Sequence, residues 1–202
     1  MAGNTLLKLK QDERERKREI ILQAAQKLFS KKGMSGVNMR DIAQEAGVSV
    51  GFIYCYFSGQ TDVFLELFEA GATDIYDRIS AIAETERSRP FRALARTYVS
   101  YLHENRMFYQ MMISFMLEGE LSDGALDRLN GSLRRIMDGV EVIFKKEKEG
   151  ASRTLAHSFF AALNGVMISF VNYPGRTPQD IRNRTFVLAE TIADQFEQKA
   201  KQ

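Results

Sequence analysis

The chain has 202 residues, of which 45% are hydrophobic and only three are proline, so it can bury a core and form long helices. It has no run of about 18 uncharged apolar residues, and charged residues interrupt its first twenty positions, which argues against a membrane span and a secretory signal. The formal net charge of +2 does not by itself indicate nucleic-acid binding, and the lone Cys55 suits a reducing compartment, so we expect a cytoplasmic protein.

Positive charge is concentrated at the start of the chain. The first 34 residues include nine basic and four acidic side chains, and residues 1–13 are predicted to form a basic arm. A first helix is expected over roughly Asp12–Lys32, ending at Gly33, a residue that suits a helix C-terminus. The arm either contacts an anionic partner or remains a solvated, frayed end.

Residues 38–57 predict two short helices joined by a tight turn. Asn38 and Ser49 are residue types that cap the start of a helix, and Gly47 tolerates the positive φ of a turn. Apolar residues four positions apart give each helix a face to bury: Ile42 and Ala46, then Ile53 and Phe57. The pattern is typical of a helix-turn-helix, which places its second helix in the DNA major groove. A pair of small helices within a larger bundle is the alternative.

The outward residues of the second helix suit DNA contact, because glycine admits a close approach while rings and hydroxyls reach bases and phosphates. They are Val50, Gly51, Phe52, Tyr54 and Tyr56.

These residues together resemble the DNA-binding domain of the tetracycline-repressor (TetR) family of bacterial regulators. The resemblance runs through Ile21-Leu22, Leu28-Phe29, Asp41-Ile42-Ala43, Ala46-Gly47-Val48-Ser49 and Tyr56-Phe57. It implies DNA contacts at Arg40, Ser49, Val50, Gly51 and Phe52, with phosphate contacts at Tyr54 and Tyr56; Asn38 is counted with them. Members usually carry lysine where this chain has Gln60, so that contact loses its charge, although a backbone N–H there can still bind phosphate.

Helical patterns continue to the end of the chain. The expected helices begin near Thr61, then run over Pro90–Asn105, Arg106–Met116, a stretch ending near Lys148, Ser152–Val171 and Pro178–Lys199. We therefore predict an all-α chain of about nine helices. The resemblance implies a DNA-binding domain over residues 14–72 and a ligand-binding and dimerisation domain over residues 73–202.

The last two helices are more apolar than one packing partner requires. In the TetR family such helices form a four-helix dimer interface, and two recognition helices about 34–36 Å apart would read a palindromic operator. A monomer with a large core is the alternative. The candidate interface residues are Phe159, Phe160, Leu163, Phe170, Phe186, Val187, Ile192 and Phe196.

An aromatic and methionine-rich set on the fifth and sixth helices is the expected site for a small apolar effector. Methionine surfaces adapt to varied apolar ligands, whereas ordinary core packing is the alternative. The candidates are Tyr101, His103, Met107, Phe108, Met111, Met112, Phe115, Met116, Asn164 and Met167, with Tyr109 among the residues that could orient a ligand.

The sequence therefore predicts a DNA-binding transcriptional regulator, a homodimeric repressor that an effector releases from double-stranded DNA. The alternatives are a corepressor-type or ligand-independent DNA binder and an all-α enzyme. Because the sequence lacks glycine-rich phosphate loops, His-Glu-x-x-His spacing and clustered cysteines, we expect no catalytic residues, no metal and no cofactor.

Overall fold

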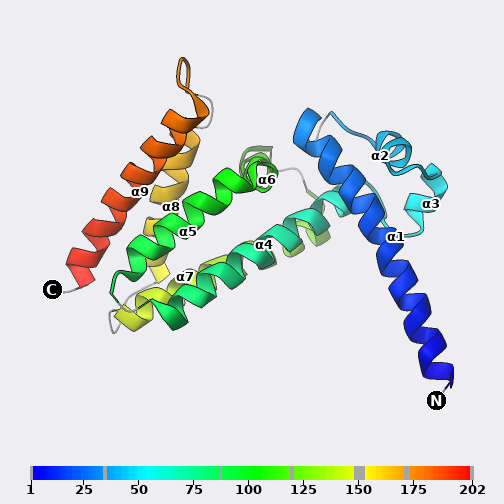
Figure 1. The fold of residues 1–202 in the computed structure, drawn as a ribbon, viewed down its shortest axis with the longest axis horizontal. Helices are drawn as coiled ribbons and strands as arrows, with labels where there is room; N and C mark the ends of the chain where they lie inside the picture. Colours follow the sequence, from blue (N-terminus) through cyan, green and yellow to red (C-terminus); the bar gives the residue numbers. More distant parts are fainter. Residues whose placement is uncertain are drawn as a thin grey trace. The chain divides into compact units, whose positions relative to one another are not determined.

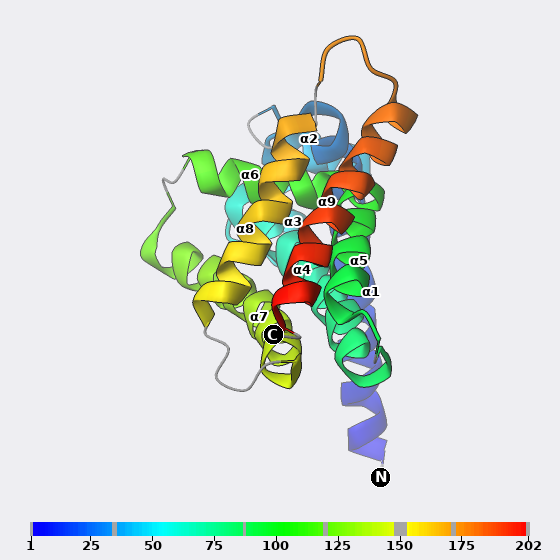
Figure 2. The same ribbon diagram turned by 90° about the vertical axis from the view of Figure 1, so that its left-hand side faces the viewer.

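The computed structural model describes residues 2–33, 36–86, 88–118, 121–147, 153–170 and 173–200. Within these ranges every regular element is an α-helix, which confirms the predicted all-α class (Figures 1 and 2). The side chains of residues 2–6, 116–118, 147 and 199–200 lie outside the description, so the effector-site candidate Met116 is not placed. In the described part, no helix is both long and apolar enough to cross a membrane.

The helices are α1 (Ala2–Lys32), α2 (Met39–Ala46), α3 (Val50–Tyr54), α4 (Gln60–Thr85), α5 (Pro90–Glu104), α6 (Arg106–Glu118), α7 (Asp123–Glu147), α8 (Arg153–Phe170) and α9 (Pro178–Ala200). Most expected boundaries agree to within one or two residues, but α1 starts about ten residues before the expected Asp12. Residues 8–18 are rich in good helix formers, and Lys17 donates to Glu13 one turn away at 2.6 Å, so the helix continues through the predicted arm.

The chain divides into two compact units. The first comprises Met1–Glu69 and Arg106–Leu129, and the second comprises Ala70–Asn105 and Asn130–Gln202. Residues 106–129 thus group with the helix-turn-helix, whereas the sequence placed them with the C-terminal helices. The physical reason is aromatic packing inside the first unit. Phe108 stacks on Phe68 and Phe115 packs edge-on against Phe64, each pair with ring centroids 4.9 Å apart.

An ionic cluster adds to this packing in the first unit. The Arg128 guanidinium, from α7, donates two hydrogen bonds of 2.8 Å to Glu69 and one of 2.5 Å to Asp62, both on α4. Asp62 also accepts a bond from the Ser58 backbone N–H at 3.0 Å. Burial opposes its ionisation, yet the Ser58 N–H and Arg128 hold the pKa of Asp62 below its ordinary value. The start of α7 is therefore tied to the start of α4, directly after the helix-turn-helix.

The second unit is built around a cluster of four phenylalanine rings from α5, α7, α8 and α9. Phe91 lies 4.6 Å from Phe144, and Phe159 lies 4.9 Å from Phe196, measured between ring centroids. Figure 2 shows α8 and α9 side by side, with α9 next to α5.

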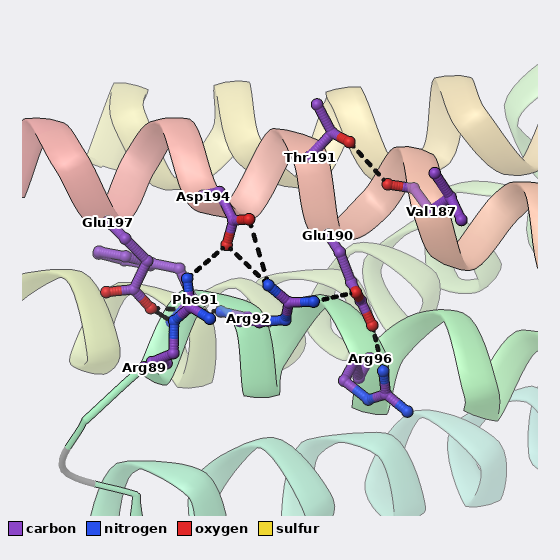
Figure 3. Close-up of polar contacts among 9 residues, drawn as sticks. All are labelled: Arg89, Phe91, Arg92, Arg96, Val187, Glu190, Thr191, Asp194 and Glu197. Atoms are coloured by element: carbon purple, nitrogen blue, oxygen red, sulfur yellow. Dashed lines mark hydrogen bonds and ion pairs between the residues drawn. The ribbon is translucent and has the colours of Figure 1, made fainter.

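Polar contacts along α5 and α9 hold these two helices together (Figure 3). Glu197 is 6% exposed, and its carboxylate accepts from the backbone N–H of Phe91 at 3.0 Å, which caps the start of α5. Arg92 binds Asp194 at 3.2–3.3 Å and also pairs with Glu190. The α5-facing side of α9 is therefore occupied within the protomer.

Candidate nucleic-acid interface

A capping box starts α2. The Asn38 side-chain oxygen accepts from the backbone N–H of Arg40 at 2.9 Å and of Asp41 at 3.0 Å, while the Asp41 carboxylate accepts from the Asn38 N–H at 2.9 Å. The cap at Asn38 was expected from the sequence, and the return bond from Asp41 was not. Because it serves in the cap, the Asn38 side-chain oxygen has a structural role at this proposed DNA-contact position.

The turn and the second helix follow the predicted pattern. Gly47 has φ of +68°, the left-handed conformation that a side chain disfavours. The Ser49 hydroxyl oxygen accepts from the Phe52 N–H at 3.2 Å and caps α3. Ile53 and Phe57 are buried in the core of the first unit. With both ends fixed and one side buried, α3 presents its remaining side at a defined angle.

The predicted contact residues form a partly open surface. Arg40, Ser49, Gly51 and Tyr54 are exposed, and the Tyr54 side chain keeps 54% of its accessible surface. Val50, Phe52, Tyr56 and Gln60 are half-buried. The rings of Phe52 and Tyr56 lie 5.2 Å apart and support each other, so they present a fixed pair of aromatic edges.

Gly51 is a glycine that the protein's own structure does not require. Its φ is not positive, and a Cβ placed there would meet nothing within 4 Å. A glycine inside a helix costs up to about 1 kcal/mol relative to alanine. The open space above Gly51 leaves room for the surface of a partner to approach the backbone closely.

Side chains from α1 lie next to this surface. Lys10, Glu13, Arg14 and Lys17 line a groove of about 330 Å³ together with Cys55 and Tyr56. The Arg14 guanidinium carbon is 5.9 Å from the centre of the Tyr56 ring. Sequence reasoning named the basic tract but not this juxtaposition, which the i, i+4, i+7 spacing of the three cations on a continuous helix could have indicated.

Comparison with known proteins agrees with this geometry. Residues 21–67 match the model of the family described as bacterial regulatory proteins, tetR family. Residues 21–67 are thus a TetR-family segment. The matched segment spans α2 and α3, the C-terminal part of α1 and the start of α4, so it includes the predicted contact residues of the helix-turn-helix.

Two relatives and one solved structure illustrate the similarity. The chain is 27% identical over 97 residues to the uncharacterized regulator YfiR of Bacillus subtilis and 40% identical over 68 residues to the regulator AcrR of Shigella flexneri. These matches cover 48% and 34% of this chain, and only 44% and 31% of the two relatives. The fold resembles that of FadR from Bacillus subtilis in complex with stearoyl-CoA, with a TM-score of 0.69, 19% identity and coverage of 87% and 95%.

The dimer candidates differ widely in exposure. Phe159 and Leu163 are buried in the protomer's own core, and Phe196 packs into the same ring cluster. Phe160, Phe170, Phe186 and Ile192 are half-buried, whereas Val187 is 60% exposed. Two further apolar side chains on α8, Leu155 and Ile168, are 40% and 50% exposed and were not singled out from the sequence.

The effector candidates divide between the two units. Met107, Phe108, Met111, Met112 and Phe115 belong to the first, and Tyr101, His103, Asn164 and Met167 to the second. Most of these side chains are buried, and several form hydrogen bonds within the chain.

The polar candidates of the second unit have partners there. The Tyr101 hydroxyl donates to the Gly71 carbonyl oxygen, and Asn164 accepts from the Tyr98 hydroxyl, each at 2.8 Å. His103 lies 2.7 Å from the Thr185 hydroxyl, and burial, with Arg182 nearby, lowers the pKa of its imidazole. Within the described residues, no group of three or more His, Cys, Asp or Glu side chains could hold a metal ion.

Proposed function

We propose that this protein is a TetR-family DNA-binding transcriptional regulator that binds a palindromic operator as a homodimer. The observation that carries the proposal is the exposed side of α3. It combines the open backbone at Gly51 with the exposed Tyr54 on a helix whose first turn is capped and whose other side is buried. This surface suits a groove of double-stranded DNA, because a close backbone approach and polar tips are what reading bases and phosphates requires.

Selection of duplexes from a random pool, followed by affinity measurement, tests this proposal. Phe52→Ala should relax base preference at defined operator positions, at a cost of about 1–3 kcal/mol per base pair. Tyr54→Phe should weaken binding by a similar factor on every duplex, because a phosphate contact positions the protein without reading sequence. Failure to enrich any sequence would contradict the proposal. Equal effects of both variants on all duplexes would contradict only the division of roles.

The homodimer in this proposal would use exposed surface of α8 and α9. Leu155 and Ile168 on α8 and Val187 on α9 are large apolar side chains that these helices leave exposed. Two copies related by a two-fold axis would bury these side chains and present two recognition helices to one face of the duplex.

We also propose that the protein is a repressor and that an apolar effector releases it from DNA. The Tyr109 hydroxyl on α6 supports an effector, because it is buried and has no hydrogen-bond partner in the described part of the chain. Burial raises the pKa of Tyr109 to about 12, so the phenol stays protonated and could donate to a ligand oxygen. The fold relative that holds stearoyl-CoA suggests a long acyl chain as the first compound to test.

The effector proposal predicts that stearoyl-CoA lowers operator affinity at least about tenfold, a coupling of about 1.4 kcal/mol. Tyr109→Phe should reduce that response while leaving the affinity for DNA without ligand unchanged. Operator titrations with and without stearoyl-CoA, together with a panel of fatty acids, measure both quantities. Unchanged operator affinity across the whole panel would contradict release by an apolar effector.

A further inference from the structure

We propose that the N-terminal half of α1 is a cationic helical arm that contacts the phosphates of duplex DNA beside the recognition helix. The inference rests on the proposed function, since it adds a second contact region for the same DNA. It concerns a cationic face defined by Lys10, Arg14 and Lys17, together with the Tyr56 hydroxyl at the end of α3.

The cationic face has the dimensions of a DNA backbone contact. Lys10, Arg14 and Lys17 are spaced i, i+4 and i+7, so they lie on one side of α1 and line the groove of about 330 Å³. Seven residues of helix advance about 10 Å, and one DNA strand carries a phosphate roughly every 3.4 Å along its axis. The three positions therefore span about three successive phosphates. Lys17 pairs with Glu13, which also lines the groove, so Lys10 and Arg14 are the cations proposed to bind phosphate.

The cations along α1 differ in whether they already have a partner within the protein. Arg18 is paired with Glu66, and its guanidinium carbon lies 5.3 Å from the centre of the Phe57 ring, so it belongs to the fold of the first unit. Lys10 and Arg14 form no ion pair or hydrogen bond with the residues the structure describes. Like charges four residues apart destabilise a helix slightly, and the one internal contact described for this pair is that of Arg14 with the Tyr56 ring, so an anionic partner would relieve the repulsion.

The position of the groove identifies that partner. Tyr56 lines it, and the Phe52 ring of α3 lies 5.2 Å from the Tyr56 ring. The Tyr56 hydroxyl donates to no described residue, so it is available to a phosphate oxygen next to the cations. Figure 1 shows the N-terminal half of α1 extending beyond α2 and α3. A duplex that meets α3 would therefore have its backbone within reach of the arm, whereas a small anion would use only part of the face.

The test compares two double variants that remove the same charge from opposite ends of α1. Lys10→Gln/Arg14→Gln removes the proposed phosphate-binding side chains, and Lys31→Gln/Lys32→Gln changes two exposed lysines of the last turn. Glutamine preserves helix propensity, which circular dichroism checks. Affinity for a 30-base-pair duplex of random sequence is measured between about 50 and 200 mM salt, and removing one cation from a phosphate lowers the log–log slope by about 0.9.

Each bound protomer then neutralises two fewer phosphates, so the fall in affinity over that salt range becomes about tenfold smaller than in the parent for every protomer bound. The Lys31/Lys32 variant and Arg14→Lys should keep the parental slope. Equal salt slopes for the two double variants would contradict the proposed arm. A loss of affinity confined to a selected operator would also contradict it, because phosphate contacts do not read sequence. A parent that binds no duplex would overturn the proposed function itself, which is a distinct outcome.

Discussion

Phe159→Ala is expected to lower the free energy of unfolding by about 3–5 kcal/mol, because it removes a ring from the centre of the second unit. Phe159 is fully buried, and the rings of Phe91, Phe144 and Phe196 lie 4.9–6.0 Å away. The backbones of these three neighbours are held by three different helices, so the surroundings cannot close over the cavity. Urea denaturation followed by circular dichroism measures the decrease. An unchanged urea midpoint would contradict this core position.

Val187→Asp is the counterpart of Phe159→Ala, because Val187 is an exposed residue among the same dimer candidates. Since the Val187 side chain is 60% exposed and makes no ring contact with the cluster, the near-ultraviolet circular dichroism of the aromatic core should stay like the parent's. If the outer side of α8 and α9 holds a second copy, the added charge should shift the mass in light scattering from two chains to one. A dimeric Val187→Asp protein would contradict the interface but not the core.

Gly51→Ala is expected to stabilise the protein and weaken its DNA binding at the same time. Alanine should add about 0.5–1 kcal/mol to the unfolding free energy, because the new Cβ meets nothing within 4 Å and alanine favours the helix. The same methyl group would separate the backbone from the DNA. The expected cost is about 10- to 100-fold in affinity, comparable to one base contact of about 1–3 kcal/mol.

Gly131→Ala is the control, because Gly131 also lies in a helix, α7, with open space at its Cβ. It should gain similar stability with parental DNA affinity. Thermal unfolding and duplex titration of both variants give the two quantities. A Gly51→Ala protein that is stabilised and binds DNA like the parent would show that the duplex does not approach this backbone.

The helix-turn-helix could be predicted from the sequence because its signals are local. Asn38 and Ser49 cap helices through backbone groups two or three residues away, and Gly47 takes its conformation within the turn itself. The apolar spacing also identified Ile53 and Phe57 as buried. Such signals need no knowledge of the rest of the chain, which is why this segment and the helix boundaries were predicted well.

What the sequence by itself determined is the helical class, the boundaries of most helices and the capped motif that carries the proposed DNA contacts. Only the tertiary structure decided that α6 packs with the first unit, that Phe159 is core while Val187 is exposed, and that Lys10 and Arg14 lie beside Tyr56. The physical reason is that periodicity shows which residues share one side of a helix. Which neighbour covers that side depends on contacts between residues far apart in the chain, and no local pattern records them.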